Sequence, residues 1–325
     1  MNEKPVIELP SGIFTISLDF ELIWGTLDKP KHTRFRRLCA IEREQVIDRL
    51  LELFEEYRIS ATWCTVGHLF LDRNRGEGTR SKDADAPIFY GRDLVDKIRA
   101  CKTPQEIGSH TFTHRVFNDP ACTRSVAEEE LAASNRAATD LGLHMTSFAF
   151  PRNRIGHLDL LPKHGFTTFR GQDDRWYART GNRRWFHRAG HLADMFCATT
   201  PSPVLPVWHD EGIWEIPGSM LFTPSHGLRR IVPARARVHR ARKGLRRAVA
   251  TKKIFHLWFH PTDVVVRREA MLDGLRQIFE TASELRDAGS LSILNMSEIT
   301  ALLNQPVQRR AQSETTPALE EAILI

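Results

Sequence analysis

The sequence has no apolar run long enough to cross a membrane as a helix. A spanning helix needs about 20 predominantly apolar residues, and no uninterrupted apolar run in the 325 residues approaches that length. The first residues, MNEKPVIELPSGIF, also lack the apolar core and the small-residue cleavage site of a secretory signal. These absences predict a cytoplasmic protein, which could still lie at the periphery of a membrane.

Cysteines are few, and they are scattered along the chain. Their number is odd and no two form a CxxC pair, which argues against a disulfide framework and against a thiolate zinc site. We therefore expect free thiols at all five positions: Cys39, Cys64, Cys101, Cys122 and Cys197. The composition, 41% hydrophobic and 26% charged, is typical of a folded soluble chain. The length would allow two domains or a single α/β barrel with insertions.

Basic residues exceed acidic ones, giving a net charge of +6. Most of the excess lies in residues 228–253, where Arg or Lys recurs at nearly every second or third position. This basic segment could form an amphipathic helix that contacts a membrane surface or phosphates. The alternative is the solvated face of an ordinary barrel helix. No aromatic residues interleave with the charges, so we expect no binding of nucleic acid.

Short apolar runs alternate with helix-like stretches along most of the chain. This alternation is typical of repeated βα units with a mainly parallel sheet. It predicts strands at residues 14–18, 59–67, 106–109, 147–150, 166–169, 254–259 and 291–294, and helices at 41–57, 94–100, 124–141, 157–164 and 267–287. Residues 171–217 have no clean period and are expected to form an elaborate loop or a small insertion. The polar residues 305–325 are expected to be a disordered tail.

Two histidines in the segment QEIGSHTFTH are candidate metal ligands. His110 and His114 are four residues apart, so both would lie on one face if the backbone were helical there. The spacing alone is weak evidence in a chain with 14 histidines. The pair follows a predicted strand, however, and the loops after strands build the active sites of α/β barrels.

Two acids and a further histidine also follow predicted strands. Asp19 and Glu21, in SLDFELIWG, are two residues apart and leave an extended backbone on one face. They could serve a catalytic site or form a structural ion pair with an arginine. His256 and His260, in HLWFHP, share a face of a later strand. His260 is nearer the strand end and the expected mouth, whereas a hydrogen-bonded place in the core suits His256 better.

The chemistry of these residues is coherent. Two imidazoles and one carboxylate leave open positions on a divalent ion, as in catalytic rather than structural sites. A bound ion lowers the pKa of its water, a second carboxylate can take the proton, and a histidine can act as general acid. Sugar rings could stack on tryptophans, although packing in the core is an equal alternative for each: Trp24, Trp176, Trp185 and Trp214.

Together these segments resemble the polysaccharide deacetylase family, also known as the NodB-homology or carbohydrate esterase 4 family. SLDFE is similar to the family's first acidic motif, ATWCTVG to its next strand, and EIGSHTFTH to its histidine motif. FAFPRNR approximates the arginine and proline motif, and the neighbourhood of His260 resembles the last motif. The resemblance implies a distorted (β/α)7-type barrel in residues 1–304, a single domain with an irregular insertion.

The resemblance also implies roles for individual residues. It implies one divalent metal ion, often zinc, bound by Glu21, His110 and His114, with Asp19 as the general base; the reverse assignment of the two acids stays open. His260 would be the general acid. Arg152 would steady the base, and Asp174, in the segment DDRW, would pair with the acid histidine.

The implied reaction is removal of an N-acetyl group from an amino sugar of a polysaccharide or its cytoplasmic precursor. Two alternatives remain. One is hydrolysis of another non-peptide C–N bond, as in allantoinase-like and amidase-like enzymes, and the other is a catalytically silent carbohydrate-binding protein. If the substrate is a cytoplasmic precursor, the basic segment would contact a membrane or a lipid-linked substrate. The sequence indicates no oligomeric state.

Overall fold

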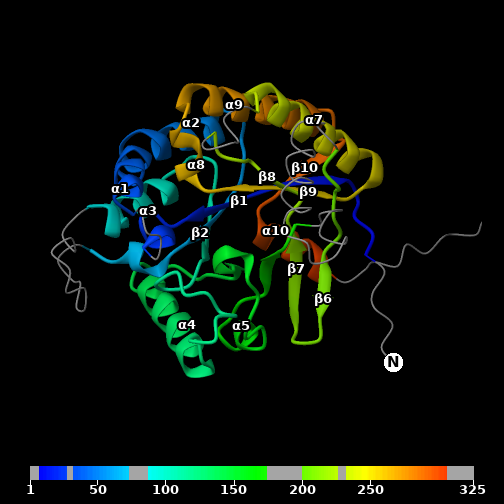
Figure 1. Cartoon of the computed structure of the whole chain (residues 1–325). Helices are drawn as coiled ribbons and strands as arrows, with labels where there is room; N and C mark the ends of the chain where they lie inside the picture. The colour runs from blue at the N-terminus through cyan, green and yellow to red at the C-terminus, as the bar shows by residue number, and fades with distance from the viewer. Residues whose placement is uncertain (1–6, 28–31, 73–86, 174–199, 226–231, 306–325) are drawn as a thin grey trace, which may run out of the picture.

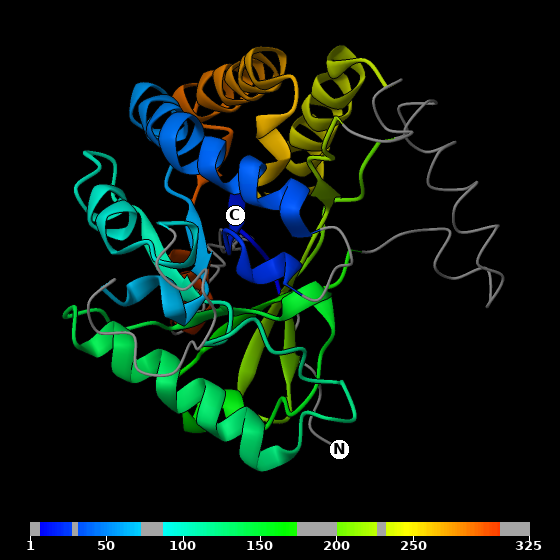
Figure 2. The same cartoon turned by 60° about the vertical axis from the view of Figure 1, so that its left-hand side comes forward.

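A computed structural model describes residues 7–27, 32–72, 87–173, 200–225 and 232–305. Parallel strands curl around a buried apolar core, and helices cover the outside of the sheet (Figures 1 and 2). The barrel strands are β1 (Gly12–Phe20), β2 (Thr62–Thr65), β3 (Glu106–Ser109), β4 (Ser147–Ala149), β5 (Thr168–Gly171), β7 (Ile213–Pro217), β8 (Met220–Leu221) and β9 (Ile254–Phe259). The predicted distorted (β/α)7-type barrel is therefore confirmed.

One strand in two pieces closes the barrel. β7 pairs in parallel with β5, and β8, only two residues later, pairs in parallel with β9 at the other end of the sheet. Between them the amide of Ser219 donates to the carbonyl of His256, 2.9 Å away. A Cβ at Gly218 would overlap the carboxylate of Asp173, so a larger residue there would have to displace that side chain. β7 and β8 together thus act as one strand between β5 and β9, which brings the number of strand positions around the barrel to seven.

β1 is the central strand. All nine of its residues are buried, so it is covered on both faces, which explains why GIFTISLDF reads as an almost continuous apolar run. It pairs with β9 along one edge. Along its other edge it pairs first with β10 (Leu291–Ile293) and then with β2. β6 (Val207–His209) is the antiparallel partner of β7.

The helices pack against the outside of the sheet. α7, α9 and α2 lie side by side across one flank, and α4 and α5 lie across the opposite one (Figure 1). Their bounds are α1 (His32–Ile41), α2 (Ile47–Glu56), α3 (Arg92–Arg99), α4 (Arg124–Thr139), α5 (Leu160–Lys163), α7 (Ala234–Thr251), α8 (Pro261–Val265), α9 (Arg268–Asp287) and α10 (Met296–Asn304). Short 3₁₀ turns occur at Trp24–Thr26, Gly67–Phe70, Pro87–Phe89 and Pro151–Asn153.

Most of the predicted elements are present, with shifted ends. The irregular region 171–217 is the main correction, because it contains β6 and the barrel strand β7. The helix predicted for residues 41–57 is also wrong in part, since helical structure begins at His32 and passes through a π-helix, η2 (Glu42–Val46). β8, α8 and α10 were not predicted. Of the expected tail, only Gln305 lies among the described residues.

The described residues allow two further predictions to be checked: that no helix spans a membrane and that the cysteines are free thiols. Within them, no helix combines the length and the apolar character that crossing a bilayer requires. Cys39, Cys64, Cys101 and Cys122 are free thiols, as expected, whereas Cys197 lies outside the described part of the chain.

The π-helix turns an acidic side chain inward. Glu42 is fully buried, and its Oε2 accepts a hydrogen bond from the hydroxyl of Thr262 in α8. Its Oε1 is buried without a hydrogen-bond partner. Burial raises the pKa of Glu42 to about 8, and the charge of Glu21 adds to the rise, whereas the hydrogen bond from Thr262 opposes it. The carboxyl group is therefore neutral at neutral pH.

We expect Glu42→Gln to stabilise the protein increasingly as the pH rises. The folded protein binds the proton of Glu42 more tightly than the unfolded chain does, so protonation of Glu42 stabilises the fold. This stabilisation is fully present below about pH 4.5 and is lost as the pH rises towards 8. Glutamine stays neutral and avoids the loss. The gain should reach a few kcal/mol at pH 8, at about 1.4 kcal/mol per pKa unit.

Urea unfolding at pH 5 and pH 8 measures this difference. The exposed neighbour Glu44 supplies the matched control, Glu44→Gln, which should change little at either pH. A difference between wild type and Glu42→Gln that does not grow with pH would show that Glu42 is not neutral in the folded protein.

Candidate metal centre

Three of the predicted residues converge at the carboxyl ends of β1 and β3. Glu21 Oε2 lies 3.0 Å from His114 Nε2 and 3.5 Å from His110 Nε2. One ligand atom from each side chain lies within 4.8 Å of the others. Since two imidazoles and a carboxylate are a common ligand set for a divalent transition metal, this cluster could hold such an ion.

The hydrogen bonding of His110 fits metal binding. Its Nδ1 donates to the carbonyl of Ala149 at 2.8 Å, so the unprotonated Nε2 faces Glu21 and His114. That Nε2 is buried and has no hydrogen-bond partner. A buried polar atom without a partner is costly, and a bound cation would satisfy it. The bond to Ala149 also fixes the ring orientation, as carbonyl partners do for metal-ligating histidines.

The backbone between the two histidines is not helical, contrary to the geometry first considered for this spacing. Thr111 and His114 have left-handed backbones, with φ of 62° and 61°. The carboxylate of Glu130, from α4, holds the turn: it accepts from the amides of Phe112 at 2.9 Å and Thr113 at 2.8 Å, and from the hydroxyl of Thr113 at 2.5 Å. These three bonds hold His110 and His114 in position. Sequence reasoning did not identify Glu130.

Asp19 forms a buried ion pair with Arg170, from β5. Arg170 Nη1 and Nη2 donate to the two carboxylate oxygens of Asp19 at 2.6 and 2.8 Å. Burial would raise the pKa of Asp19, but the charge and hydrogen bonds of Arg170 lower it to about 2. Arg170 also lies over the ring of Trp258, 4.4 Å from its centroid. Asp19 is therefore ionised and rigidly oriented.

The aspartate partner of His260 is Asp263, three residues away. His260 Nδ1 lies 2.9 Å from Asp263 Oδ2, and its Nε2 points into the site, 3.6 Å from Asp19 and 3.9 Å from Glu21. Burial would lower the pKa of His260, but the charges of Asp263 and Glu21 raise it to about 10. Asp174, the partner expected from the sequence, lies outside the described residues.

His256 lies in the core, in accord with the sequence reading. Its Nδ1 donates to the carbonyl of Pro217 at 3.2 Å, and its Nε2 lies 2.8 Å from the hydroxyl of Ser17. Burial and the charge of Arg170 lower the pKa of His256 to about 3, so the ring is neutral. His256 thus links β9, β1 and the end of β7 below the site.

Arg152 lies elsewhere than the sequence reading expected. The bidentate partner of Asp19 is Arg170, which was missed because it lies inside a strand rather than in the arginine and proline segment. Arg152 follows β4 and lines the cavity above the metal cluster. That cavity has a volume of about 250 Å³ and is lined by Asp19, Glu21, Gly25, His114, Arg152, Asn153, Trp258 and His260.

The tryptophans have different environments. Trp24 lines a second cavity beside the first. Trp214 packs against Trp208, with ring centroids 4.9 Å apart, and donates to Asn304. Trp176 and Trp185 lie outside the described residues.

Most of the basic segment forms α7, and some of its arginines form hydrogen bonds within the protein. Arg237 is buried and donates to the carbonyl of Val232 at 2.9 Å and to the hydroxyl of Thr223 at 3.2 Å. Arg242 donates to Thr281, in α9, at 2.9 Å. The helix therefore packs on the barrel, and its contact with a membrane or a lipid-linked substrate stays a prediction.

A family model described as polysaccharide deacetylase matches residues 25–164. Over these residues the chain is similar to the polysaccharide deacetylase family, in agreement with the resemblance of its motifs. The match includes the two histidines of the metal cluster but not Asp19, Glu21 or His260. Among proteins with curated descriptions, none matches the sequence.

Solved structures share the deacetylase fold at low sequence identity. A protein from Mycobacterium smegmatis described as a polysaccharide deacetylase is 17% identical, with a TM-score of 0.62 over 99% of this chain and 100% of its own. One from Pseudomonas aeruginosa PAO1 with the same description is 13% identical, with a TM-score of 0.64 over 92% and 93%. The Puue allantoinase is 13% identical, with a TM-score of 0.61 over 90% of each chain. At these identities the likeness establishes the fold alone.

We expect Gly25→Ala to weaken metal binding at the Glu21, His110 and His114 cluster. A Cβ at Gly25 would overlap the carboxylate of Glu21, so the added methyl group must displace that side chain. Disturbing the support of a metal ligand commonly lowers affinity about 10–100-fold. Titration with Zn²⁺ against a competing chelator measures the change. Gly274→Ala is the control, because a Cβ there meets its neighbours at ordinary distances of 3.4 and 3.5 Å. Equal affinities in both variants would contradict the prediction.

We expect Arg170→Gln to destabilise the fold far more than Arg152→Gln. Removing Arg170 leaves the buried carboxylate of Asp19 without its countercharge, which typically costs about 3–5 kcal/mol. Arg152 is exposed, so its loss should cost less than about 1 kcal/mol. Denaturant unfolding measures the loss in the free energy of unfolding for each variant relative to wild type. A larger loss with Arg152→Gln would restore the first assignment of the arginine.

Proposed function

We propose that this protein hydrolyses the N-acetyl group of an amino sugar in a polysaccharide or its precursor. The observation that carries the proposal is the arrangement around one cavity. A metal-binding cluster, an ionised aspartate and a histidine with its own aspartate partner all face it. This set supplies a metal site, a base and an acid, the groups that metal-assisted amide hydrolysis needs.

Glu21, His110 and His114 are our candidates for binding a divalent ion, with zinc as the first choice because of the nitrogen-rich ligand set. When bound, such an ion would polarise the acetyl carbonyl and acidify the attacking water. Both oxygens of Asp19 accept hydrogen bonds from Arg170, which favours Glu21 over Asp19 as the carboxylate ligand.

Asp19 is the proposed general base. Arg170 keeps it ionised and holds its carboxylate in one orientation, facing the cavity. With a pKa of about 2 it is a weak base, so it can accept a proton only from an acidified water. Arg170 is thus a positioning residue that acts through Asp19.

His260 is the proposed general acid. Its Nε2 faces the cavity, where it can deliver a proton to the departing amine nitrogen. Asp263 accepts from Nδ1 at 2.9 Å, which fixes the ring and stabilises its protonated form. The short helix α8 begins at this point, with Asp263 also accepting from the amide of His260 at 3.2 Å.

A second reaction shares the same requirements. The allantoinase fold resembles this one, and its name indicates a ureide substrate, so the same groups could cleave a ureide C–N bond. A silent carbohydrate-binding protein is the third candidate. We place the protein in the cytoplasm, where a sugar precursor would be its substrate and the basic segment could contact a membrane.

We expect acetate release from at least one acetylated amino sugar or oligosaccharide, and none from ureides. The panel pairs N-acetylglucosamine and chito-oligosaccharides with allantoin, and measures acetate and ureide cleavage separately. A chelator should abolish the activity, and added Zn²⁺ should restore it. His260→Ala should lower kcat by about 10²–10⁴, as expected for a general acid. Arg276→Gln, on α9 and outside both cavities, should behave like wild type.

Each competing reading has its own outcome in this panel. Ureide cleavage without acetate release would favour the allantoinase-like reaction. Metal binding without any turnover would favour the silent protein. Unaltered activity after metal removal would refute the metal-dependent mechanism.

A further inference from the structure

A second cavity opens beside the metal centre and shares two residues with it. It has a volume of about 350 Å³, and both His114 and Arg152 line the two cavities. Its other walls include Trp24, Arg115 and Asp119. A substrate bound with its acetyl group at the metal cluster could therefore extend into this second cavity, which we name the outer cavity.

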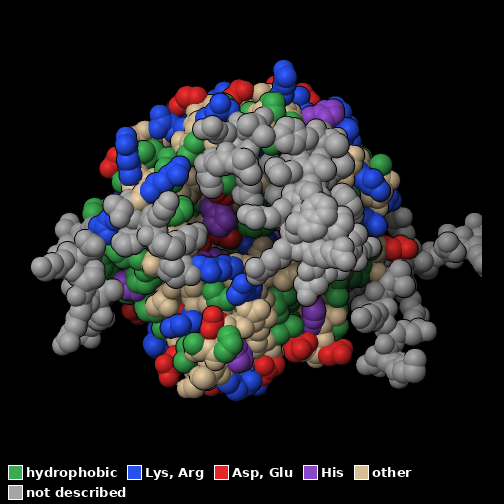
Figure 3. All heavy atoms as spheres, viewed as in Figure 1, with side chains coloured by type: hydrophobic (Ala, Val, Ile, Leu, Met, Phe, Trp, Pro, Cys, Tyr) green, Lys and Arg blue, Asp and Glu red, His purple; other side chains and the backbone are tan. Residues whose placement is uncertain are grey.

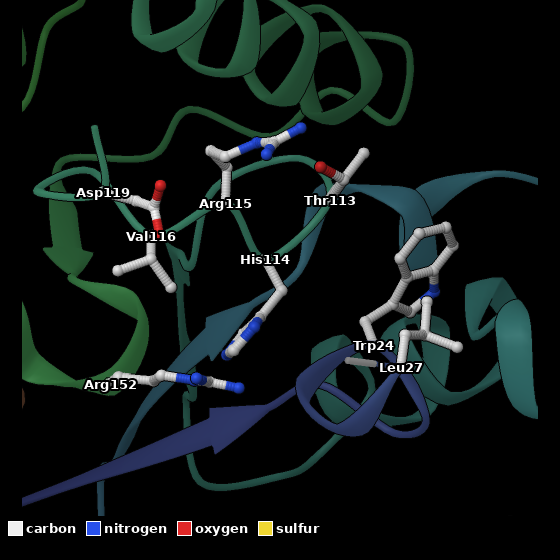
Figure 4. A pocket seen from close by; sticks show the side chains of 8 residues that line it. All are labelled: Trp24, Leu27, Thr113, His114, Arg115, Val116, Asp119 and Arg152. Atoms are coloured by element: carbon white, nitrogen blue, oxygen red, sulfur yellow. The ribbon is translucent and has the colours of Figure 1, made fainter. Parts of the chain in front are cut away.

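Two arginines from different loops border the outer cavity. Arg152 follows β4 and reaches below His114 towards Trp24, while Arg115 lies on the other side of His114 (Figure 4). The backbone directs Arg152 there, because Arg152 and Asn153 both have left-handed conformations, with φ of 59° and 53°. Arg170 already forms the ion pair with Asp19, so the reaction has no need of Arg152 in that role.

The charges around the outer cavity are unequal. Arg115 and Arg152 supply two positive charges, and Asp119 supplies one negative charge. Asp119 Oδ1 also accepts from the amide of Ala121 at 2.9 Å. In Figure 3 the hollow that exposes histidine and acidic side chains has Lys and Arg side chains along its lower edge. Because His114 and Arg152 line both cavities, the outer cavity lies directly next to the metal cluster.

An aromatic wall completes the outer cavity. Trp24 is almost fully buried, and its Nε1 donates to the carbonyl of Phe89 at 3.1 Å. Its ring also packs against His68, with centroids 4.2 Å apart. A fixed indole beside guanidinium groups suits a ligand that combines a ring with an oxyanion, because arginine binds phosphate and carboxylate in a bidentate manner.

We propose that the outer cavity binds an oxyanion, a phosphate or carboxylate, carried by the acetylated sugar. The substrate class is then an anionic acetamido sugar, such as a sugar phosphate, rather than a neutral polysaccharide. This proposal rests on the function proposed above, because it assumes that the acetyl group lies at the metal cluster.

The test compares binding and turnover of matched sugars by the metal-loaded protein. The probes are N-acetylglucosamine, N-acetylglucosamine 1-phosphate and an N-acetylated aminouronic acid. Titration calorimetry gives the Kd of each, and acetate release gives kcat/KM. Wild type should favour one of the anionic sugars over the neutral one, and the two anionic probes show whether phosphate or carboxylate is the natural group.

Variants that change one charge should shift this preference in opposite directions. Arg115→Gln should reduce the anionic-to-neutral ratio of affinities about tenfold, the size of a lost charge-assisted hydrogen bond. Arg115→Lys should recover part of it. Asp119→Asn should increase the ratio, since it removes a repelling charge. Arg276→Gln, on α9 and outside both cavities, should leave the ratio unchanged.

Binding and turnover separate the two proposals. Equal Kd values for neutral and anionic sugars in wild type, or an unchanged ratio in both Arg115→Gln and Asp119→Asn, would overturn the oxyanion site even if acetate is released. A strong preference for the anionic sugars, altered as stated by the variants, would support the site even if no acetate appears. In that case the proposed hydrolysis, and not the oxyanion site, would have failed.

Discussion

The ion pair between Asp19 and Arg170 connects most of the functional part of this structure. It crosses the barrel from β1 to β5, and both side chains are almost completely inaccessible to water. Charges so deeply buried are tolerated only when their hydrogen bonds are satisfied, because desolvation costs several kcal/mol per ion. Arg170 largely meets this condition, because its two terminal nitrogens also donate to Ser17 at 3.2 Å and to Asn153 at 2.9 Å, and only its Nε is buried without a partner.

The same pair gives the two neighbouring carboxylates different environments. Asp19 has both oxygens bound by a permanent cation, whereas Glu21, two residues later, has three histidines as its ion-pair partners among the described residues. Burial alone would raise the pKa of Glu21, but the charges of His114 and His260 hold it well below its usual range. Two acids on one strand end can therefore serve different purposes, because their partners come from different strands of the barrel.

The sequence predicted the parts of the site that depend on local spacing. EIGSHTFTH and SLDFE gave the metal cluster because each motif directly follows a strand, and strand ends meet at one mouth. The sequence could not predict pairs of side chains that meet only because the barrel closes. Arg170 is separated from Asp19 by 151 positions and looks like any strand residue. β7 was missed because IWEIP is short and lies in a region without periodicity.

The left-handed backbones of Thr111 and His114 determine how the site would respond to a metal ion. Positive φ in residues other than glycine is unfavourable, so such a turn persists only when its surroundings fix it. Here Glu130 fixes the turn independently of any ligand. The histidines are thus preorganised: little conformational entropy remains to be lost when an ion arrives, and access through the cavity, rather than rearrangement of the loop, would set the rate of metal uptake.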